Sequence, residues 1–177
     1  EKPMWRVKKS VAVADGAMNV DLLATARAET DLSLLTAVMF DLLEDALGIH
    51  PTLLVRQTDG AWRARVLGSE TDFWWIEDEI ALDDATGELV IASVTRPEGV
   101  RLTIDPEQIS KLHFWYSRKM NYYPSPDRPQ RAQHGMLRLF LSGVKGKDLI
   151  RGDETRLAYQ LQFLADARAA TAGSTIP

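Results

Sequence analysis

Residues 52–67 read TLLVRQTDGAWRARVL, two alternating runs of apolar and polar residues on either side of Asp59-Gly60. Alternation with a period of two is typical of a strand that buries one face. Asp-Gly readily adopts the positive φ angles that a tight type I′ turn requires. We therefore predict a β-hairpin with strands at 52–58 and 61–67, and an antiparallel sheet around it.

Further strands are expected on both sides of this hairpin. Residues 83–87, DDATG, are typical of a turn and predict a second hairpin. Val100, Leu102 and Ile104 alternate with polar residues after an expected turn at 96–99. The segment 109–117 is expected to be a short turn leading into a strand. In all, the additional strands are expected at 5–14, 73–82, 88–95, 100–104, 109–117 and 137–141.

Three other segments predict helices. Asp31 is a good N-cap, apolar residues follow at helical spacing to Ala46, and Gly48 and Pro51 are typical of a helix end. Residues 19–28 predict a brief helix, and Asp153 can cap a last helix with Leu157, Leu161, Leu164 and Ala165 on one face. The expected fold is α+β, an antiparallel meandering sheet of about six or seven strands with N-terminal helices and a C-terminal helix packed on it.

Length and composition predict one domain over residues 1–177, with 1–4 and 172–177 frayed. The chain is 45% hydrophobic, enough for a real core, and contains no cysteine. The absence of cysteine suits a reducing compartment, and no apolar run approaches the roughly 20 residues that cross a bilayer. The first residues lack the apolar segment of a signal peptide. We therefore expect a cytoplasmic protein without a membrane partner.

Charge is unevenly distributed along the chain. The net charge is −4, which predicts no general affinity for nucleic acid or membranes. Residues 70–88 contain eight acids and no Lys or Arg. Residues 108–151 contain nine bases against two acids. The second segment is therefore a basic region inside an acidic protein.

No signature of catalysis or of a metal site is present. The segment 143–148 resembles the end of a phosphate-binding loop, but Leu141 stands where that loop needs glycine, and Asp148 stands where it needs Ser or Thr. Ser142 lacks the glycine two positions earlier that a nucleophile elbow requires. His50, His113 and His134 share no ligand spacing. We assign no catalytic residue and no metal ligand, and we do not expect an enzyme.

The best candidate for a binding surface is the segment 113–138, where cations alternate with aromatic residues. Arg and Lys neutralise negative charge, while tyrosine and tryptophan rings stack on planar groups. The predicted ligand-binding residues are His113, Trp115, Tyr116, Arg118, Lys119, Tyr122, Tyr123, Arg128, Arg131, His134 and Arg138. Trp74 and Trp75 point to opposite faces of an expected strand, so one of them is a candidate interface residue.

The second half of the chain contains VRLTID at 100–105, Ile109-Ser110, FWYSRK at 114–119 and MLRLFL at 136–141. In these segments, about a third of the chain, it resembles the cytoplasmic haem-utilisation carrier proteins of Gram-negative bacteria. It implies a haem-binding protein with leading helices, a meandering sheet and a closing helix. The family's haem ligand lies in a histidine-bearing early strand, whereas 73–77 reads FWWIE. Haem would therefore need His113 or His134 as its ligand.

Three functions follow from these observations. The first is a non-enzymatic binding protein that holds an anionic partner, such as the planar cofactor haem, on the surface at 113–138. The second is a nucleic-acid-binding module that uses the same surface, with an affinity that falls steeply with salt. The third is a protein-interaction subunit whose acidic and basic segments dock other chains or further copies of itself.

Overall fold

Strands make up nearly all of the described chain. The computed structural model describes residues 5–28, 30–31, 36–43, 51–67, 76–109, 111–120, 134–142, 148–149 and 151–172. The strands are β1 (Trp5–Ala14), β2 (Ala17–Ala26), β3 (Thr30–Asp31), β4 (Thr36–Leu43), β5 (Thr52–Gln57), β6 (Trp62–Val66), β7 (Ile76–Ala81), β8 (Ala85–Ser93), β9 (Arg96–Ile104), β10 (Lys111–Met120), β11 (His134–Ser142), β12 (Asp148–Leu149) and β13 (Glu154–Leu164). One short helix, α2 (Ala167–Ala170), follows β13.

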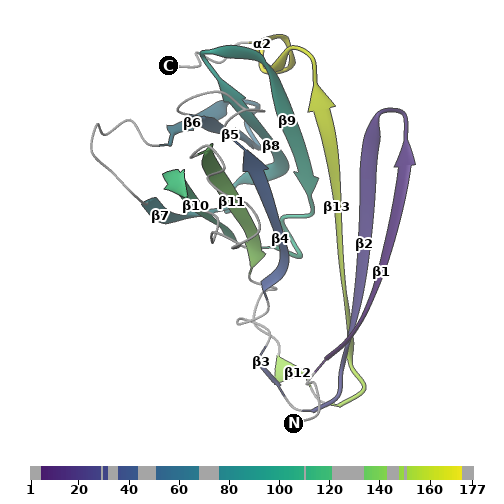
Figure 1. Ribbon diagram of the computed structural model, residues 1–177. Helices are drawn as coiled ribbons and strands as arrows, with labels where there is room; N and C mark the ends of the chain where they lie inside the picture. Colours follow the sequence, from purple (N-terminus) through teal and green to yellow (C-terminus); the bar gives the residue numbers. More distant parts are fainter. Residues whose placement is uncertain are drawn as a thin grey trace.

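The strands form two stacked antiparallel sheets. The larger sheet has seven strands in the order β1-β2-β13-β9-β8-β5-β6, and the smaller has four in the order β4-β11-β10-β7. A third pairing joins β12 to β3. In Figure 1 the smaller sheet covers the part of the larger one near β5, β8 and β9, whereas the β1–β2 hairpin lies beyond it. Within the described residues, the fold is therefore a two-layer β-sandwich in which the β1–β2 flank of the larger sheet extends beyond the smaller sheet.

The core lies between the two sheets. Leu89 of β8 and Leu102 of β9 are completely buried on the inner face of the larger sheet. Leu112 and Phe114 of β10 and Leu139 of β11 are equally buried and belong to the same cluster. The inner face of the larger sheet is the face in contact with this core, and the outer face is the opposite one.

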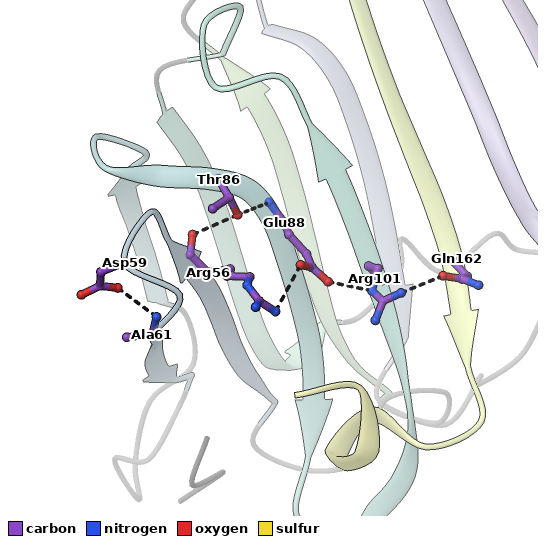
Figure 2. Close-up of polar contacts among 7 residues, drawn as sticks. All are labelled: Arg56, Asp59, Ala61, Thr86, Glu88, Arg101 and Gln162. Atoms are coloured by element: carbon purple, nitrogen blue, oxygen red, sulfur yellow. Dashed lines mark hydrogen bonds and ion pairs between the residues drawn. The ribbon is translucent and has the colours of Figure 1, made fainter. Parts of the chain in front are cut away.

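The hairpin at 52–67 is confirmed. Thr52 pairs with Val66 and Arg56 with Trp62. The turn is not the expected type I′, because Gly60 has a positive φ of 88° whereas Asp59 does not, and the backbone N–H of Gly60 donates to the carbonyl of Gln57 at 2.9 Å. Figure 2 shows how the carboxylate of Asp59 accepts a hydrogen bond of 2.9 Å from the backbone N–H of Ala61, which stabilises that turn. The strands expected at 5–14, 100–104, 109–117 and 137–141 are also present.

The expected α+β fold is wrong, because the three predicted helices are strands. Residues 36–43 form β4, the segment 17–26 forms β2, and residues 154–164 form β13. Each of these segments is rich in alanine or leucine, and its apolar residues satisfy a strand period as well as a helix period. In β13, for example, Leu157, Tyr159, Leu161 and Phe163 alternate. Residues 154–164 form a strand rather than a helix because their backbone pairs with β2 on one side and with β9 on the other.

Two expected turns are also corrected. Residues 83–87 do not close a hairpin, because β7 pairs with β10 in the smaller sheet while β8 pairs with β5 and β9 in the larger one. The turn at Asp83-Asp84 therefore carries the chain from one layer of the sandwich to the other, and residues 85–87 already belong to β8. Residues 96–99 lie inside β9. In that strand, Gly99 allows close packing, because a Cβ there would lie 2.7 Å from the Cβ of Ala167 in α2.

The helix α2 covers a small part of the outer face. Ala167 packs on Leu54, Val90 and Ala92, which point away from the main core. The carboxylate of Asp166 accepts a hydrogen bond from the backbone N–H of Ala169 and caps the helix. No helix in the described part of the chain is long and apolar enough to cross a membrane.

We predict that Gly87→Ala lowers the free energy of unfolding by about 3 kcal/mol, through backbone strain and overlap together. Gly87 has a φ of +87°, and a Cβ there would overlap the carbonyl oxygen of Ile104 and lie 2.9 Å from Pro106 Cδ. Gly60→Ala is the matched control. Gly60 has a φ of +88° with nothing within 4 Å of the added Cβ. Its loss should be nearer to about 1 kcal/mol. Urea denaturation measures both values, and equal losses would contradict the packing argument.

Candidate functional site

The outer face of the larger sheet carries a row of polar side chains. In β13, Leu157 and Tyr159 enter the core, so Arg156, Ala158 and Gln160 lie on the outer face. In β2, Val20 and Leu22 are buried in the core, so Asn19 and Asp21 lie on the outer face. The pairing of Gln160 with Asn19 and of Ala158 with Asp21 brings these residues side by side.

An open pocket of about 550 Å³ lies over this row, between β1, β2, β13 and β9. This size is within the range of small-molecule sites. We call it the outer pocket. The register places Ser10, Asp21 and Ala158 in one line across its strands, and Ala12, Asn19, Gln160 and Thr103 in the next. Its lining residues are Ser10, Val11, Ala12, Asn19, Val20, Asp21, Thr103, Ile104, Asp105, Arg156, Ala158, Tyr159 and Gln160.

Asp21 and Arg156 form an ion pair at one side of the outer pocket. The Nε of Arg156 donates to Oδ1 of Asp21 at 2.8 Å, and Nη2 donates to Oδ2. The hydrogen bond from Arg156 holds the pKa of the Asp21 carboxyl below its ordinary value, and that of Arg156 is raised for the same reason. Both groups therefore stay charged at neutral pH, and their charges offset each other.

The remaining polar groups of the outer pocket include both donors and acceptors. The amide of Gln160 donates to Oδ1 of Asn19 at 2.8 Å, which aligns the two amides across the strands. Oδ1 of Asp105 accepts a hydrogen bond of 2.9 Å from the backbone N–H of Glu107. Among the described residues, the other carboxylate oxygen of Asp105 has no hydrogen-bond partner. This oxygen is therefore available to a ligand.

A second set of polar contacts continues from the outer pocket across the sheet. Glu88 Oε1 lies 3.1 Å from Arg101 Nε, and Glu88 Oε2 lies 3.7 Å from Arg56 Nη1. Nη1 of Arg101 donates to Oε1 of Gln162 at 3.2 Å. Figure 2 shows Arg56, Glu88, Arg101 and Gln162 in one line over four strands. The guanidinium of Arg56 lies over the ring of Trp62, 5.4 Å from its centre. We call these five residues the polar ladder.

The charges of the outer pocket favour a neutral ligand over an anion. The ion pair of Asp21 and Arg156 is neutral as a whole, and the amides of Asn19 and Gln160 are uncharged. Asp105 then leaves one negative charge, which would repel a phosphate or a propionate. Among the described residues, no group of three His, Asp or Glu side chains could hold a metal ion.

Those of the predicted ligand-binding residues that the structure describes lie elsewhere, on β10 and β11 of the smaller sheet. The register places Trp115 opposite Arg138 and Met120 opposite His134, so the paired strands β10 and β11 bring part of the predicted set together. Tyr116 is only 1% exposed and belongs to the core, so it cannot present its ring to a ligand at the surface. His113 is half-buried on β10.

The remaining predicted residues form two groups. Arg118 and Lys119 lie on β10. Tyr122, Tyr123, Arg128, Arg131, Trp74 and Trp75 lie outside the described residues. The binding of an anionic ligand or nucleic acid at 113–138, and an interface at Trp74 and Trp75, stay predictions.

Sequence reasoning missed the outer pocket because its residues lie far apart in the chain. Asp21 and Arg156 are 135 positions apart, and Asn19 and Gln160 are 141 apart. The one available signal was the alternation of apolar and polar residues in 154–163. Read as a strand, this segment would have placed Arg156, Ala158 and Gln160 together on one face.

Comparison with solved structures identifies the fold. A candidate aldose 1-epimerase from Escherichia coli K12 matches with a TM-score of 0.54 at 15% identity, over 90% of this chain and 60% of its own. A candidate aldose 1-epimerase from Klebsiella pneumoniae matches with a TM-score of 0.55 at 12% identity, over 94% of this chain and 52% of its own. The galactosidase domain of an α-galactosidase–sucrose kinase gives 0.57 at 10% identity, over 94% of this chain and 23% of its own.

At these identities the likeness shows the fold alone. The chain spans a little over half the length of the two epimerase-like structures. No protein-family model matches the sequence, and no curated protein does. The chain thus has the sandwich fold of aldose 1-epimerase-like proteins, in place of the helix-flanked sheet that the haem-carrier resemblance implied.

The Asp21–Arg156 pair predicts a pH dependence of stability. Because the folded-state pKa of Asp21 lies below its ordinary value of 3.8, the pair stabilises the fold above that pH. The contribution is lost as pH falls through the lowered pKa. The difference in urea midpoint between the wild type and Asp21→Asn should therefore be constant near neutrality and shrink in acid. Glu98→Gln, which removes an exposed carboxylate, should show no such trend. A difference that grows in acid would contradict the assignment.

Proposed function

We propose that the outer pocket binds a neutral polyhydroxylated ligand, a sugar. The observation that carries the proposal is the composition of the pocket wall. Amide, hydroxyl and carboxylate groups alternate there with the small side chains Ala12 and Ala158. A sugar presents hydroxyl groups that both donate and accept hydrogen bonds, so it needs partners of both kinds. Asn19, Gln160 and Thr103 supply both, while Asp105 supplies an acceptor.

The shape of the site agrees with such a ligand. Ala158 pairs with Asp21 on β2, and Asp105 directly follows β9 on the other side of β13, so the backbone positions of the two acids are two strand spacings apart, about 10 Å. A side chain as small as alanine leaves room for a ring between them. The names of the matched structures, two candidate aldose 1-epimerases and a galactosidase domain, agree with a sugar ligand by analogy of fold.

The chemistry of the pocket supports binding rather than turnover. Acid–base catalysis at neutral pH needs a group whose pKa lies near the working pH, most often a histidine or a carboxyl with a raised pKa. No histidine is among the described residues that line the outer pocket. The pKa of Asp21 is shifted in the opposite direction, which makes its carboxylate a weaker base. Burial raises the pKa of Tyr159, so its phenol stays protonated.

We predict that Ala158→Leu abolishes sugar binding without unfolding the protein. Ala158 is exposed on the outer face, so a leucine there fills the pocket without disturbing the core. Isothermal titration with a panel of neutral mono- and oligosaccharides, including galactose, should show the affinity falling at least tenfold, about 1.4 kcal/mol. The matched control is Ala64→Leu. Ala64 is exposed and pairs with Leu54 at the far side of the same sheet, so its replacement should leave the affinity unchanged.

NMR shift mapping on the wild type locates the ligand, and polarimetry of fresh sugar solutions tests for turnover. Shifts should centre on Asn19, Thr103 and Gln160. The proposal fails if no sugar binds, or if a sugar binds equally well to Ala158→Leu. Mutarotation faster than in the protein-free solution would contradict the assignment of binding without turnover.

A further inference from the structure

The strand register joins the polar ladder to the outer pocket. Glu88 of the ladder pairs with Thr103, and Thr103 pairs with Gln160, and both of these partners line the outer pocket. Gln160 pairs in turn with Asn19. From β5, Arg56 reaches Glu88 (Figure 2). Cross-strand partners lie on the same face, about 5 Å apart. These five residues therefore form one line across the larger sheet, which we call the polar row.

The polar row is accessible to solvent along its whole length. The side chains of Arg56 and Glu88 are 41% and 26% exposed. Thr103 and Asn19 are exposed, and Gln160 is half-buried. None of the five is buried, so a ligand that lies across the strands can reach each of them in turn.

The two guanidinium groups beside Glu88 keep hydrogen-bond donors for a ligand. Nε of Arg101 lies 3.1 Å from Oε1 of Glu88, and Nη1 of Arg101 donates to Gln162. Arg56 contacts Glu88 through Nη1. Among the described residues, Nη2 of both arginines and the hydroxyl of Thr103 have no hydrogen-bond partner. Because Glu88 already orients the two guanidinium groups, these donors need little reorganisation to meet a ligand.

Trp62 fixes the end of the polar row that is farther from Asn19. The guanidinium of Arg56 lies 5.4 Å from the centre of the Trp62 ring, a contact that orients the planar group. Trp62 is half-buried and packs on Leu54 and Val90, the apolar patch that α2 covers. Arg56 is therefore held between an aromatic ring on one side and the carboxylate of Glu88 on the other.

The length of the polar row exceeds that of a single sugar. Asn19 on β2 and Arg56 on β5 are separated by β13, β9 and β8, which makes four strand spacings, about 19 Å. One sugar unit of an extended chain is about as long as one strand spacing, roughly 5 Å. A monosaccharide in the outer pocket would therefore leave Glu88 and Arg56 without contact, whereas a chain of about four sugars would reach both ends.

The charges along the polar row and around it balance. Arg56 and Arg101 supply two positive charges, and Glu88 and Asp105 supply two negative ones. The ion pair at the side of the outer pocket is neutral as a whole. An anionic chain would gain no net attraction from this surface. Hydroxyl groups, by contrast, can use its donors and its acceptors alike, which favours an uncharged chain.

We infer that the outer pocket and the polar ladder form one extended site for a neutral oligosaccharide of about four sugar units, which lies across the strands. One end of the chain contacts Asn19 and Gln160, the middle contacts Thr103, and the other end contacts Arg56. The inference rests on the proposed function and adds the length of the ligand and the residue that recognises its far end.

Titration with sugars of increasing length tests the extent of the site. The probes are neutral gluco-, galacto- and manno-oligosaccharides of one to six units, measured by calorimetry or, for the weakest, by NMR. In the series that binds, the affinity should rise at least tenfold, about 1.4 kcal/mol, from one unit to four and then level off. NMR shifts that are confined to the outer pocket with one unit should extend to Glu88 and Arg56 with four.

The variant Arg56→Ala separates the far end of the site from the outer pocket. Its affinity for the four-unit sugar should fall at least tenfold, while its affinity for the one-unit sugar should stay that of the wild type, which also shows that the variant is folded. The matched control is Arg63→Ala. Arg63 is exposed on β6 and pairs with Val55, whose side chain lies in the core, so Arg63 lies on the opposite face. Both affinities of the control should be unchanged.

The possible failures of the inference and of the proposed function can be told apart. Equal affinity for one and four units would overturn the extended site and leave sugar binding in the outer pocket intact. A loss in Arg56→Ala that is the same for both lengths, or an equal loss in Arg63→Ala, would also overturn it. If no sugar of any length binds, the proposed function fails, and the extended site fails with it.

Discussion

The burial of one face of the seven-stranded sheet under the four-stranded sheet is the interaction on which the other features depend. Leu102 and Leu89 on one layer and Leu112, Phe114 and Leu139 on the other are completely buried against each other. Because strand side chains alternate, fixing one face in the core determines what the opposite face presents. Burial of the inner face therefore fixes which side chains lie on the outer face, polar ones over β2 and β13 and the apolar Leu54, Val90 and Ala92 under α2.

The central strands of the larger sheet position the polar side chains of the outer face beside one another. β13 is eleven residues long and lies between β2 and β9, so its outer side chains have neighbours on both sides. Arg156 reaches Asp21 on one neighbour, and Gln162 meets Arg101 on the other. Planar groups held in this way lose little further freedom when a ligand binds, which favours the binding of a small polar molecule.

The flank of the sandwich at β1 and β2 results from the different widths of the two sheets. The smaller sheet has four strands and cannot cover seven, so the inner face of β1 extends beyond it. The exposed valines there are those that the alternation places on the core side. In the described part of the chain, Val7, Val11 and Val13 of β1 are therefore exposed, and the wall of the outer pocket includes the same strand.

Local signals in the sequence were sufficient for the strands that carry their own turn chemistry or a clear alternation. The hairpin at 52–67 depends on Asp59-Gly60, and the alternation of Val100, Leu102 and Ile104 with polar residues predicted the strand that contains them. Residues 36–43 have no such signal, and in 154–164 the alternation from Leu157 to Phe163 competes with the helical spacing of Leu157, Leu161 and Leu164. Pairing with neighbouring strands determined that both segments are strands, because β4 pairs with β11 and β13 pairs with β2 and β9.

The sequence by itself therefore determined which segments had to bury a face, since apolar spacing is a local property. The tertiary structure alone decided that Asn19 and Asp21 meet Gln160 and Arg156, more than a hundred positions along the chain. The physical reason is that strand pairing joins backbone groups without regard to side-chain identity, so residues become neighbours through register and sheet order.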